Sequence, residues 1–324
     1  MTKIKKPNEL SKNVLLKALI YGQPGIGKST LALSMPDPLL IDCDRGTHRI
    51  EQRFLCDTVE VSGWEDIDEV LNETLSKYKT LIFDTAGKLL EYMTASIIKN
   101  NPKLNVGGGQ LSLQGYGVRK VMFQNMLARV HVMGKHIIFV AHEKEEKDGE
   151  LRFVRPEIGG SSGNDLIKEL DLVGYMEAIG TKRVIRFNPQ EKFYAKNSMK
   201  LPDPMNIPDT ANGNIFMKEI VKTYESTLTA RAAKIAEYDE FIEALRVSID
   251  QISDPNAANI FVEHIKQFDH IWDSRYQAQQ MFRKKTAELG LGLNKETGKF
   301  ESKPAVKSVF DIAEELKNEG KGNV

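Results

Sequence analysis

The sequence predicts an α/β fold in which a mostly parallel sheet is flanked by helices, with a smaller helical region in the C-terminal part. Short, wholly apolar segments alternate with segments of helical periodicity through the first two thirds of the chain. Such strands are typical of a parallel sheet that is covered on both faces. A glycine-rich phosphate-binding sequence joins the first apolar segment to a helix. The last third is helical in pattern.

The hydrophobic period of each segment predicts its secondary structure. Apolar runs of strand length occupy residues 14–21, 38–42, 80–84 and 136–141. Residues with a helical pattern occupy 30–35, 64–78, 86–99 and 117–133. A turn at 147–150 leads into shorter extended segments, which predict a meander at 171–179, 183–188 and 192–195.

Changes in composition predict the domain boundaries. Residues 1–12 are polar and rich in lysine, which indicates a flexible N-terminus. The stretch that ends with residues 206–214 is rich in Pro, Asp and Asn, which indicates a linker after a core at 13–205. A helical region at 215–289 follows, and residues 290–324, rich in Lys, Glu and Gly, predict a mobile tail.

Composition limits the compartment and the partners. Lys+Arg and Asp+Glu both number 45, so any nucleic-acid binding must come from local patches. Cys43 and Cys56 are the only cysteines and cannot form a disulfide framework, which favours a reducing compartment. The six histidines lack the spacing of a structural zinc site. Because no run approaches the ~20 apolar residues of a membrane span, we expect a soluble, cytoplasmic protein without a membrane partner.

Residues 22–29 form a complete phosphate-binding loop between an apolar run and a helix. The glycines let the backbone turn tightly, so that successive N–H groups face phosphate oxygens. Lys28 can reach the β- and γ-phosphates, and the Ser29 hydroxyl is placed to ligate Mg²⁺. The sequence therefore predicts a site for ATP and Mg²⁺. The predicted cofactor-binding residues are Gly22, Gln23, Pro24, Gly25, Ile26, Gly27, Lys28, Ser29 and Thr30.

A carboxylate at the end of the run 80–84 is the expected partner of this loop. Asp84 would lie near the Mg²⁺ that bridges the β- and γ-phosphates, and it is the second predicted metal ligand after Ser29. The same residue opens an Asp-x-x-Gly sequence that also occurs in GTPases. A GTPase needs a guanine-reading sequence in addition, and residues 294–297 lack its aspartate.

Two further strand ends supply candidate catalytic groups. Asp44 follows the run 38–42 and is the candidate general base, with Asp42 second, because the carboxyl ends of parallel strands face the ligand crevice. Both carboxylates could instead cap the turn. His142 follows the run 136–141 and could hydrogen-bond the γ-phosphate; a purely structural histidine is the alternative.

These landmarks, in this order, resemble the RecA-like nucleotide-binding ATPases of bacteriophages. The resemblance covers about residues 12–205 and rests on segments 22–29, 40–46, 81–85, 113–117, 140–143 and 194–197. It implies a RecA-like core and an ATP-driven homo-oligomer, as a ring or a filament, that binds single-stranded DNA. It also implies annealing or strand exchange in DNA recombination and repair.

The resemblance further implies two loops that face DNA, at 105–117 and 157–165. Glycines, amides, one aromatic and nearby basic residues suit backbone tracking and base stacking, although plain surface loops would have the same composition. The residues implied to contact DNA are Gly108, Gln110, Tyr116, Arg119, Lys120, Arg155, Gly160 and Ser161.

In RecA-like proteins a neighbouring subunit supplies a cation to the γ-phosphate, and Lys196 matches that position, with Arg183, Arg186 and Lys200 as substitutes. The sequence departs from the family in having Asn197 and Ser198 after this lysine, and Asp44 where a glutamate is usual. Both departures indicate slow ATP turnover. The alternative function is a nucleotide-switched loader or assembly module whose turnover is not stimulated by DNA.

Overall fold

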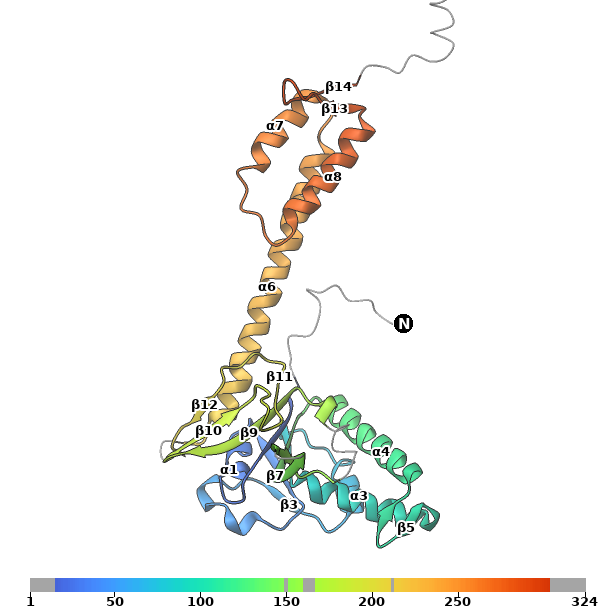
Figure 1. Ribbon diagram of the computed structural model, residues 1–324, viewed down its shortest axis with the longest axis vertical. Coiled ribbons are helices and arrows are strands. Elements are labelled where there is room, and N and C mark those ends of the chain that lie inside the picture. Colours follow the sequence, from blue (N-terminus) through green and yellow to red (C-terminus); the bar gives the residue numbers. More distant parts are fainter. Residues whose placement is uncertain (1–14, 149–150, 160–166, 211–212, 304–324) are drawn as a thin grey trace, which may run out of the picture. The chain divides into compact units, whose positions relative to one another are not determined.

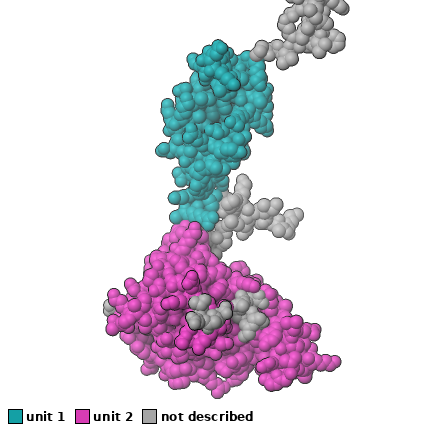
Figure 2. All heavy atoms as spheres, viewed as in Figure 1, with its two compact units in different colours: residues 1–10, 229–324 teal, residues 11–228 magenta. Residues whose placement is uncertain are grey.

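The computed structural model describes residues 15–148, 151–159, 167–210 and 213–303. In this part of the chain, residues up to 228 form one compact unit and residues from 229 form another (Figure 2). The division falls inside one long helix, α6 (Phe216–Asp250). The sequence places the boundary earlier, in the Pro- and Asp-rich stretch at 206–214, and that boundary remains a prediction.

A ten-stranded sheet forms the centre of the first unit (Figure 1). Its path runs β12-β10-β9-β1-β7-β4-β2-β3, with β11 paired to β9 and β8 paired to β7. The parallel strands of this sheet are β9, β1, β7, β4, β2 and β3. The strands are β1 (Lys17–Gly22), β2 (Pro38–Asp42), β3 (Thr58–Glu60), β4 (Thr80–Asp84), β7 (His136–Asp148), β8 (Leu151–Pro156), β9 (Leu172–Ile179), β10 (Lys182–Arg186), β11 (Lys196–Asn197) and β12 (Met205–Ile207).

Helices cover both faces of the sheet, because alternate residues of each buried strand face opposite sides. In β1, Leu19 and Tyr21 join the core under α2, α3 and α4, whereas Ala18 and Ile20 join the core under α1 and the start of α6. The helices of this unit are α1 (Lys28–Ala32), α2 (Trp64–Val70), α3 (Ala86–Asn100) and α4 (Leu113–Val132), with short 3-10 turns at Thr47–Arg49, Gln52–Phe54 and Pro102–Leu104 and a small hairpin of β5 (Asn105–Gly107) and β6 (Gln110–Leu111).

The second unit contains three helical segments and a hairpin. The end of α6 packs with α7 (Pro255–Ile265) and α8 (Ser274–Glu288) around a separate core that includes Leu245, Phe261 and Phe282. Residues 290–303, which the sequence predicts as part of a mobile tail, contain the hairpin of β13 (Leu291–Leu293) and β14 (Phe300–Ser302). This hairpin packs on the same core because Leu291 is buried and Phe300 meets the Phe282 ring edge-on.

The predicted α/β fold class is confirmed, with local differences in where elements begin and end. Helix α4 begins four residues before the predicted start, since the Ser112 hydroxyl accepts a hydrogen bond from the backbone N–H of Gly115 at 3.2 Å and caps it. The segment predicted as the first strand of a meander is β9, which pairs in parallel with β1 and lies in the middle of the sheet.

Among the described residues, no helix has the length and apolar character needed to cross a membrane.

Candidate nucleotide site and an adjoining cavity

The register of the parallel strands brings the candidate residues to one edge of the sheet. Gly22 at the end of β1 lies opposite His142 in β7, and Asp84 at the end of β4 lies opposite Val140. Asp42 at the end of β2 lies opposite Asp84. The sequence could anticipate this arrangement because each of these residues ends or directly follows an apolar run and the runs lie in parallel strands, although β7 continues past His142.

The phosphate-binding loop follows β1 directly and returns into α1. Gly22 needs to be glycine, because a Cβ at this position would lie 2.4 Å from the carbonyl oxygen of Met176 in β9. Lys28 is buried, and its ammonium donates hydrogen bonds to the carbonyl oxygens of Gly22 at 3.0 Å and Gln23 at 2.7 Å. Burial lowers the pKa of Lys28, and the charge of Asp84 acts in the opposite direction. The ammonium is therefore held inside the loop.

The donor set beside Lys28 fits a magnesium ion. Asp84 is buried at the end of β4, and its carboxylate accepts a hydrogen bond from the Ser29 hydroxyl. Burial raises the pKa of Asp84 to about 6, against the Ser29 hydrogen bond and Lys28, which lower it. Mg²⁺ in nucleotide sites uses one or two protein oxygens together with phosphate oxygens and water. Ser29 and Asp84 supply such oxygens and would be the residues that hold the ion.

The two carboxylates after β2 have different environments. Asp42 is buried and acts as a turn cap: it accepts hydrogen bonds from the backbone N–H groups of Gly46 at 3.0 Å and Thr47 at 3.1 Å, and from the Thr47 hydroxyl. Although burial opposes it, these hydrogen bonds lower the pKa of Asp42. Asp44 lies nearer the loop and pairs with Arg49, Oδ2 to Nη2 3.2 Å. The sequence did not anticipate this ion pair.

His142 and its neighbour carry buried polar atoms that nothing in the described chain satisfies. The Nδ1 atom of His142 and the Oε2 atom of Glu143 are buried without a hydrogen-bond partner among the described residues. Burial, followed by the charge of Lys28, lowers the pKa of His142. Burial therefore disfavours the charged imidazole, and one ring nitrogen has no partner among the described residues.

The nucleotide cavity has a volume of about 290 Å³ and is lined by residues from several strand ends. Lys28 and Ser29 of the loop, Asp44, Asp84 and His142 all face it, so the structure brings together most of the predicted site. Two arginines, Arg49 and Arg183, face it as well. On sequence grounds, Arg183 is expected only as a substitute for the cation that a neighbouring subunit supplies.

Lys196, the predicted trans-acting cation, lies outside this cavity in its own chain. It belongs to β11, which pairs with β9 opposite Val173 rather than at the carboxyl end of that strand. Its ammonium donates hydrogen bonds to the carbonyl oxygens of Lys168 at 3.1 Å and Leu170 at 2.5 Å. To act in a neighbouring site, the ammonium would have to leave both carbonyls.

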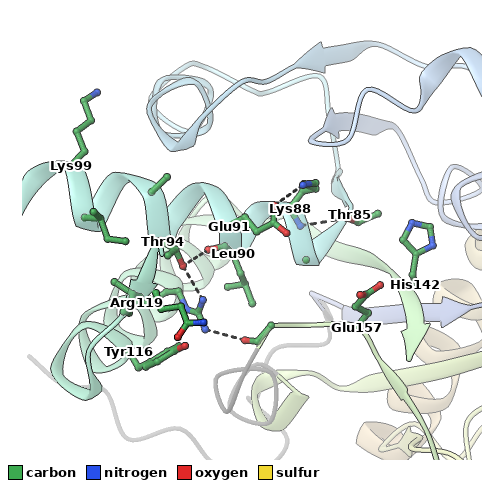
Figure 3. Close-up of a pocket in the computed structure, with 17 residues that line it drawn as sticks. Thr85, Lys88, Leu90, Glu91, Thr94, Lys99, Tyr116, Arg119, His142 and Glu157 are labelled. Carbon is green, nitrogen blue, oxygen red and sulfur yellow. Dashed lines mark hydrogen bonds and ion pairs between the residues drawn. The ribbon is translucent and has the colours of Figure 1, made fainter. Parts of the chain in front are cut away.

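A larger cavity of about 830 Å³ adjoins the nucleotide cavity and is lined by α3, β6, α4 and residues 157–159 (Figure 3). His142 lines both cavities. Figure 3 shows His142 and Glu157 at one end, and Tyr116 and Arg119 at the other. The two cavities therefore share a side chain, and the backbone N–H of Glu157 donates to the carbonyl oxygen of His142 at 2.7 Å.

Arg119 is a buried residue that joins three segments. Its guanidinium donates hydrogen bonds to the Thr94 hydroxyl in α3 at 2.9 Å and to the carbonyl oxygen of Gly159 at 3.0 Å. It also lies over the Tyr116 ring, 4.9 Å from the centroid. Its Nε atom is buried without a partner among the described residues, and no described carboxylate pairs with it. Burial lowers the pKa of Arg119. From the sequence alone, Arg119 is predicted only as a basic residue beside a loop.

The other residues implied to contact DNA lie around this cavity or beyond it. Gly108 and Gln110 lie in the exposed β5–β6 hairpin, and Lys120 is exposed on α4. Tyr116 lies in the first turns of α4 rather than in a loop. Arg155 lies in β8 and pairs with Glu146 at 3.0 Å. Gly160 and Ser161 lie outside the described residues.

The parallel sheet, the loop between β1 and α1, and the carboxylate at the end of β4 define a P-loop NTPase. A comparison with protein families gives the same answer. A family described as an AAA domain matches residues 15–199, which is more than half of the chain, and the chain belongs to this family. No match is found among curated proteins.

Proposed function

We propose that the chain is a RecA-like ATPase of phage DNA recombination and repair, located in the cytoplasm of the infected host. It binds single-stranded DNA as a homo-oligomer, promotes annealing or strand exchange, and hydrolyses ATP with Mg²⁺. The observation that carries the proposal is the position of His142, which lines both the nucleotide cavity and the larger cavity beside it. A ligand in one cavity can therefore affect the other through a single side chain.

In the nucleotide site, each residue has a distinct task in the proposed reaction. Lys28 binds the β- and γ-phosphate oxygens, for which its ammonium leaves the carbonyls of Gly22 and Gln23. Bound Mg²⁺, held by Ser29 and Asp84, would supply charge to neutralise the phosphates. Asp44 accepts a proton from the attacking water, and a ring N–H of His142 donates a hydrogen bond to a γ-phosphate oxygen.

Single-stranded DNA is the proposed ligand of the larger cavity and its rim. Tyr116 offers a ring for stacking, and the guanidinium of Arg119, which lies over that ring, lines the cavity without a described acid partner. Gln110 and Lys120 lie exposed in the elements that form the rim. Aromatic rings next to cations suit sequence-tolerant binding of single strands, because every base has a face to stack.

The test is phosphate release from ATP with and without a single-stranded oligonucleotide. We expect release to require Mg²⁺ and to rise when the oligonucleotide is added at low salt, where backbone contacts are strongest. Lys28→Ala should abolish nucleotide binding and serves as the control for contaminating activity. Replacement of ATP by GTP tests the remaining guanine-nucleotide alternative, and equal rates would favour it.

A neighbouring subunit's Lys196 is the proposed source of the cation that completes the site. Such a cation is worth ~10³–10⁵ in rate. Lys196→Ala should therefore leave ATP binding unchanged and remove hydrolysis, whereas Lys192→Ala, at an exposed lysine four residues away, should keep it. Normal turnover by Lys196→Ala contradicts the trans-acting role.

The second candidate function is a loader or assembly factor in which nucleotide only switches partner affinity. The ion pair between Asp44 and Arg49 favours it, because the candidate general base is engaged by a cation within its own chain. An oligonucleotide that fails to stimulate phosphate release at low salt, while ATP binding is normal, supports this second function.

A further inference from the structure

Arg183 lies against the phosphate-binding loop, although it belongs to a different part of the sheet. A Cβ built on Gly27 would lie 2.6 Å from the Nη1 atom of Arg183, so the guanidinium sits directly against the backbone of the residue before Lys28. Arg183 also lines the nucleotide cavity. A second cation of the same chain therefore reaches the loop.

The pleat of β10 explains why this side chain points toward the loop. Ile185 in β10 is fully buried in the core that lies under α1. Arg183 precedes Ile185 by two residues, so its side chain points to the same face of the sheet. Along the strand, Arg183 lies beyond Met176 of β9, the residue that is opposite Gly22. The side chains of Lys182 and Val184 point to the opposite face of the sheet. The sequence thus places one basic residue, and not its neighbour, on the loop side.

The charge of Arg183 is not neutralised in the described part of the chain. On the same strand, Arg186 forms an ion pair with Glu177. No described acidic side chain forms an ion pair with Arg183, which instead lies beside Gly27 in a loop built for anions. A guanidinium that lines a nucleotide cavity and has no carboxylate partner among the described residues is suited to bidentate binding of phosphate oxygens.

The strand order shows on which side of the loop the guanidinium lies. From β10, the sheet runs through β9 to β1 and then through β7 to β4, which carries Asp84. Arg183 and Asp84 therefore approach the loop from opposite sides of β1. The hydrolytic groups Asp44, Asp84 and His142 all lie on the β7 and β4 side or beyond it. Because hydrolysis takes place at the γ-phosphate, beside those groups, an arginine on the other side of the loop is expected to meet the phosphates that ATP and ADP share.

We propose that Arg183 is a second phosphate-binding residue of the nucleotide site, which acts in its own chain and contacts phosphate oxygens common to ATP and ADP. The inference rests on the proposed nucleotide binding and adds a residue to it. It differs from the role proposed for Lys196, which acts on hydrolysis from a neighbouring subunit.

The test is the affinity of the full-length protein for fluorescent ATP and fluorescent ADP. A charge-assisted hydrogen bond contributes enough for Arg183→Ala to weaken both nucleotides about 10- to 100-fold. The KM for ATP should rise by a similar factor, with kcat at saturating ATP unchanged. Arg183→Lys keeps the charge but not the two-pronged geometry and should fall in between.

Lys182→Ala is the matched control, since it removes one positive charge from the adjacent position on the opposite face. It should bind both nucleotides like the unchanged protein. Tripolyphosphate, used as a competitor, distinguishes a phosphate contact from a base contact, because Arg183→Ala should weaken it as much as it weakens ATP.

Four results overturn the proposal: unchanged affinity of Arg183→Ala, an equal loss in Lys182→Ala, a loss for ATP alone, or unchanged competition by tripolyphosphate. A lower melting temperature of Arg183→Ala without nucleotide would mean that the residue supports the fold instead. If the unchanged protein binds neither nucleotide, the proposed function itself fails, and this outcome is distinct from the others.

Discussion

Asp44 and Arg49 form an ion pair across the turn that follows β2, with 3.2 Å between Oδ2 and Nη2, and both side chains face the nucleotide cavity. Asp44 is mostly shielded, whereas more than half of the Arg49 side chain is exposed. The cation is therefore free to move while the carboxylate stays in place. Because the Arg49 guanidinium occupies an oxygen of the carboxylate that would accept the proton from water, the pair restrains the proposed reaction.

Replacement of Arg49 should relieve this restraint. We expect Arg49→Ala to raise DNA-independent phosphate release about 2- to 5-fold, a modest gain because half-exposed ion pairs are weak. Asp44→Asn should lower the same rate about 10²- to 10⁴-fold. Arg53→Ala, which removes an arginine from a surface pair with Glu51, is the control. A slower Arg49→Ala enzyme would show that Arg49 assists the reaction.

Asp84 should destabilise the folded protein at neutral pH when no nucleotide is bound. Its pKa is raised to about 6 from an ordinary value of 3.8, so the folded state holds the proton more tightly than the unfolded chain does. Ionisation then costs stability above about pH 6, and this cost disappears as the pH falls from about 6 to about 4.

Asp84→Asn removes that cost. We expect the free energy of unfolding at pH 8, measured with urea and without nucleotide, to rise by about 1–3 kcal/mol, and the gain to be lost near pH 4. The same variant should lose Mg²⁺-dependent binding of ATP. A variant that is less stable than the unchanged protein at pH 8 contradicts this prediction.

Lys28 should show a similar opposition between stability and binding. Among the described residues, its buried ammonium donates hydrogen bonds to backbone carbonyls only, and burial lowers its pKa. Lys28→Met should therefore keep or raise the melting temperature without nucleotide, while the rise that ATP causes in the unchanged protein is lost. Differential scanning fluorimetry with and without Mg-ATP measures both effects. A lower melting temperature without nucleotide would show that the ammonium is needed for folding.

Arg119 and Lys120 are adjacent residues that should affect DNA binding differently. Arg119→Leu removes two charge-assisted hydrogen bonds and should cost about 1–3 kcal/mol of folding stability as well as oligonucleotide affinity. Lys120→Ala should weaken binding uniformly across oligonucleotide sequences. If Lys120 contacts a phosphate, the slope of log affinity against log salt concentration should be smaller by about one in this variant. An unchanged slope would remove Lys120 from the proposed interface.

The sequence predicted those parts of the site that depend on local pattern. The loop at 22–29, the strand that ends in Asp84 and the position of His142 each follow from a motif or from a hydrophobic run, and parallel register brings them together. The fold class followed in the same way, because alternation of apolar strands and helices needs no knowledge of distant contacts.

The parts that the sequence did not predict depend on contacts between distant segments. Arg119 contacts Thr94 and Gly159, which lie 25 and 40 residues away in the chain. Because of these contacts, Arg119 is a buried residue that connects distant segments, whereas the sequence predicts a basic residue beside a loop. Arg183 is more than 150 residues from the loop it touches. The alternation of side chains along β10 shows which face of the sheet Arg183 occupies, but only when β9 is known to pair with β1.

The most direct test of the central claim is the affinity for a fluorescent single-stranded oligonucleotide, measured at low salt with a non-hydrolysable ATP analogue and without nucleotide. Coupling between the two cavities through His142 predicts that the analogue raises this affinity about 5- to 150-fold, and by linkage that the oligonucleotide raises nucleotide affinity by the same factor. His142→Ala should reduce the coupling while both ligands still bind. Equal oligonucleotide affinity with and without the analogue, in a protein shown to bind the analogue, would contradict the account.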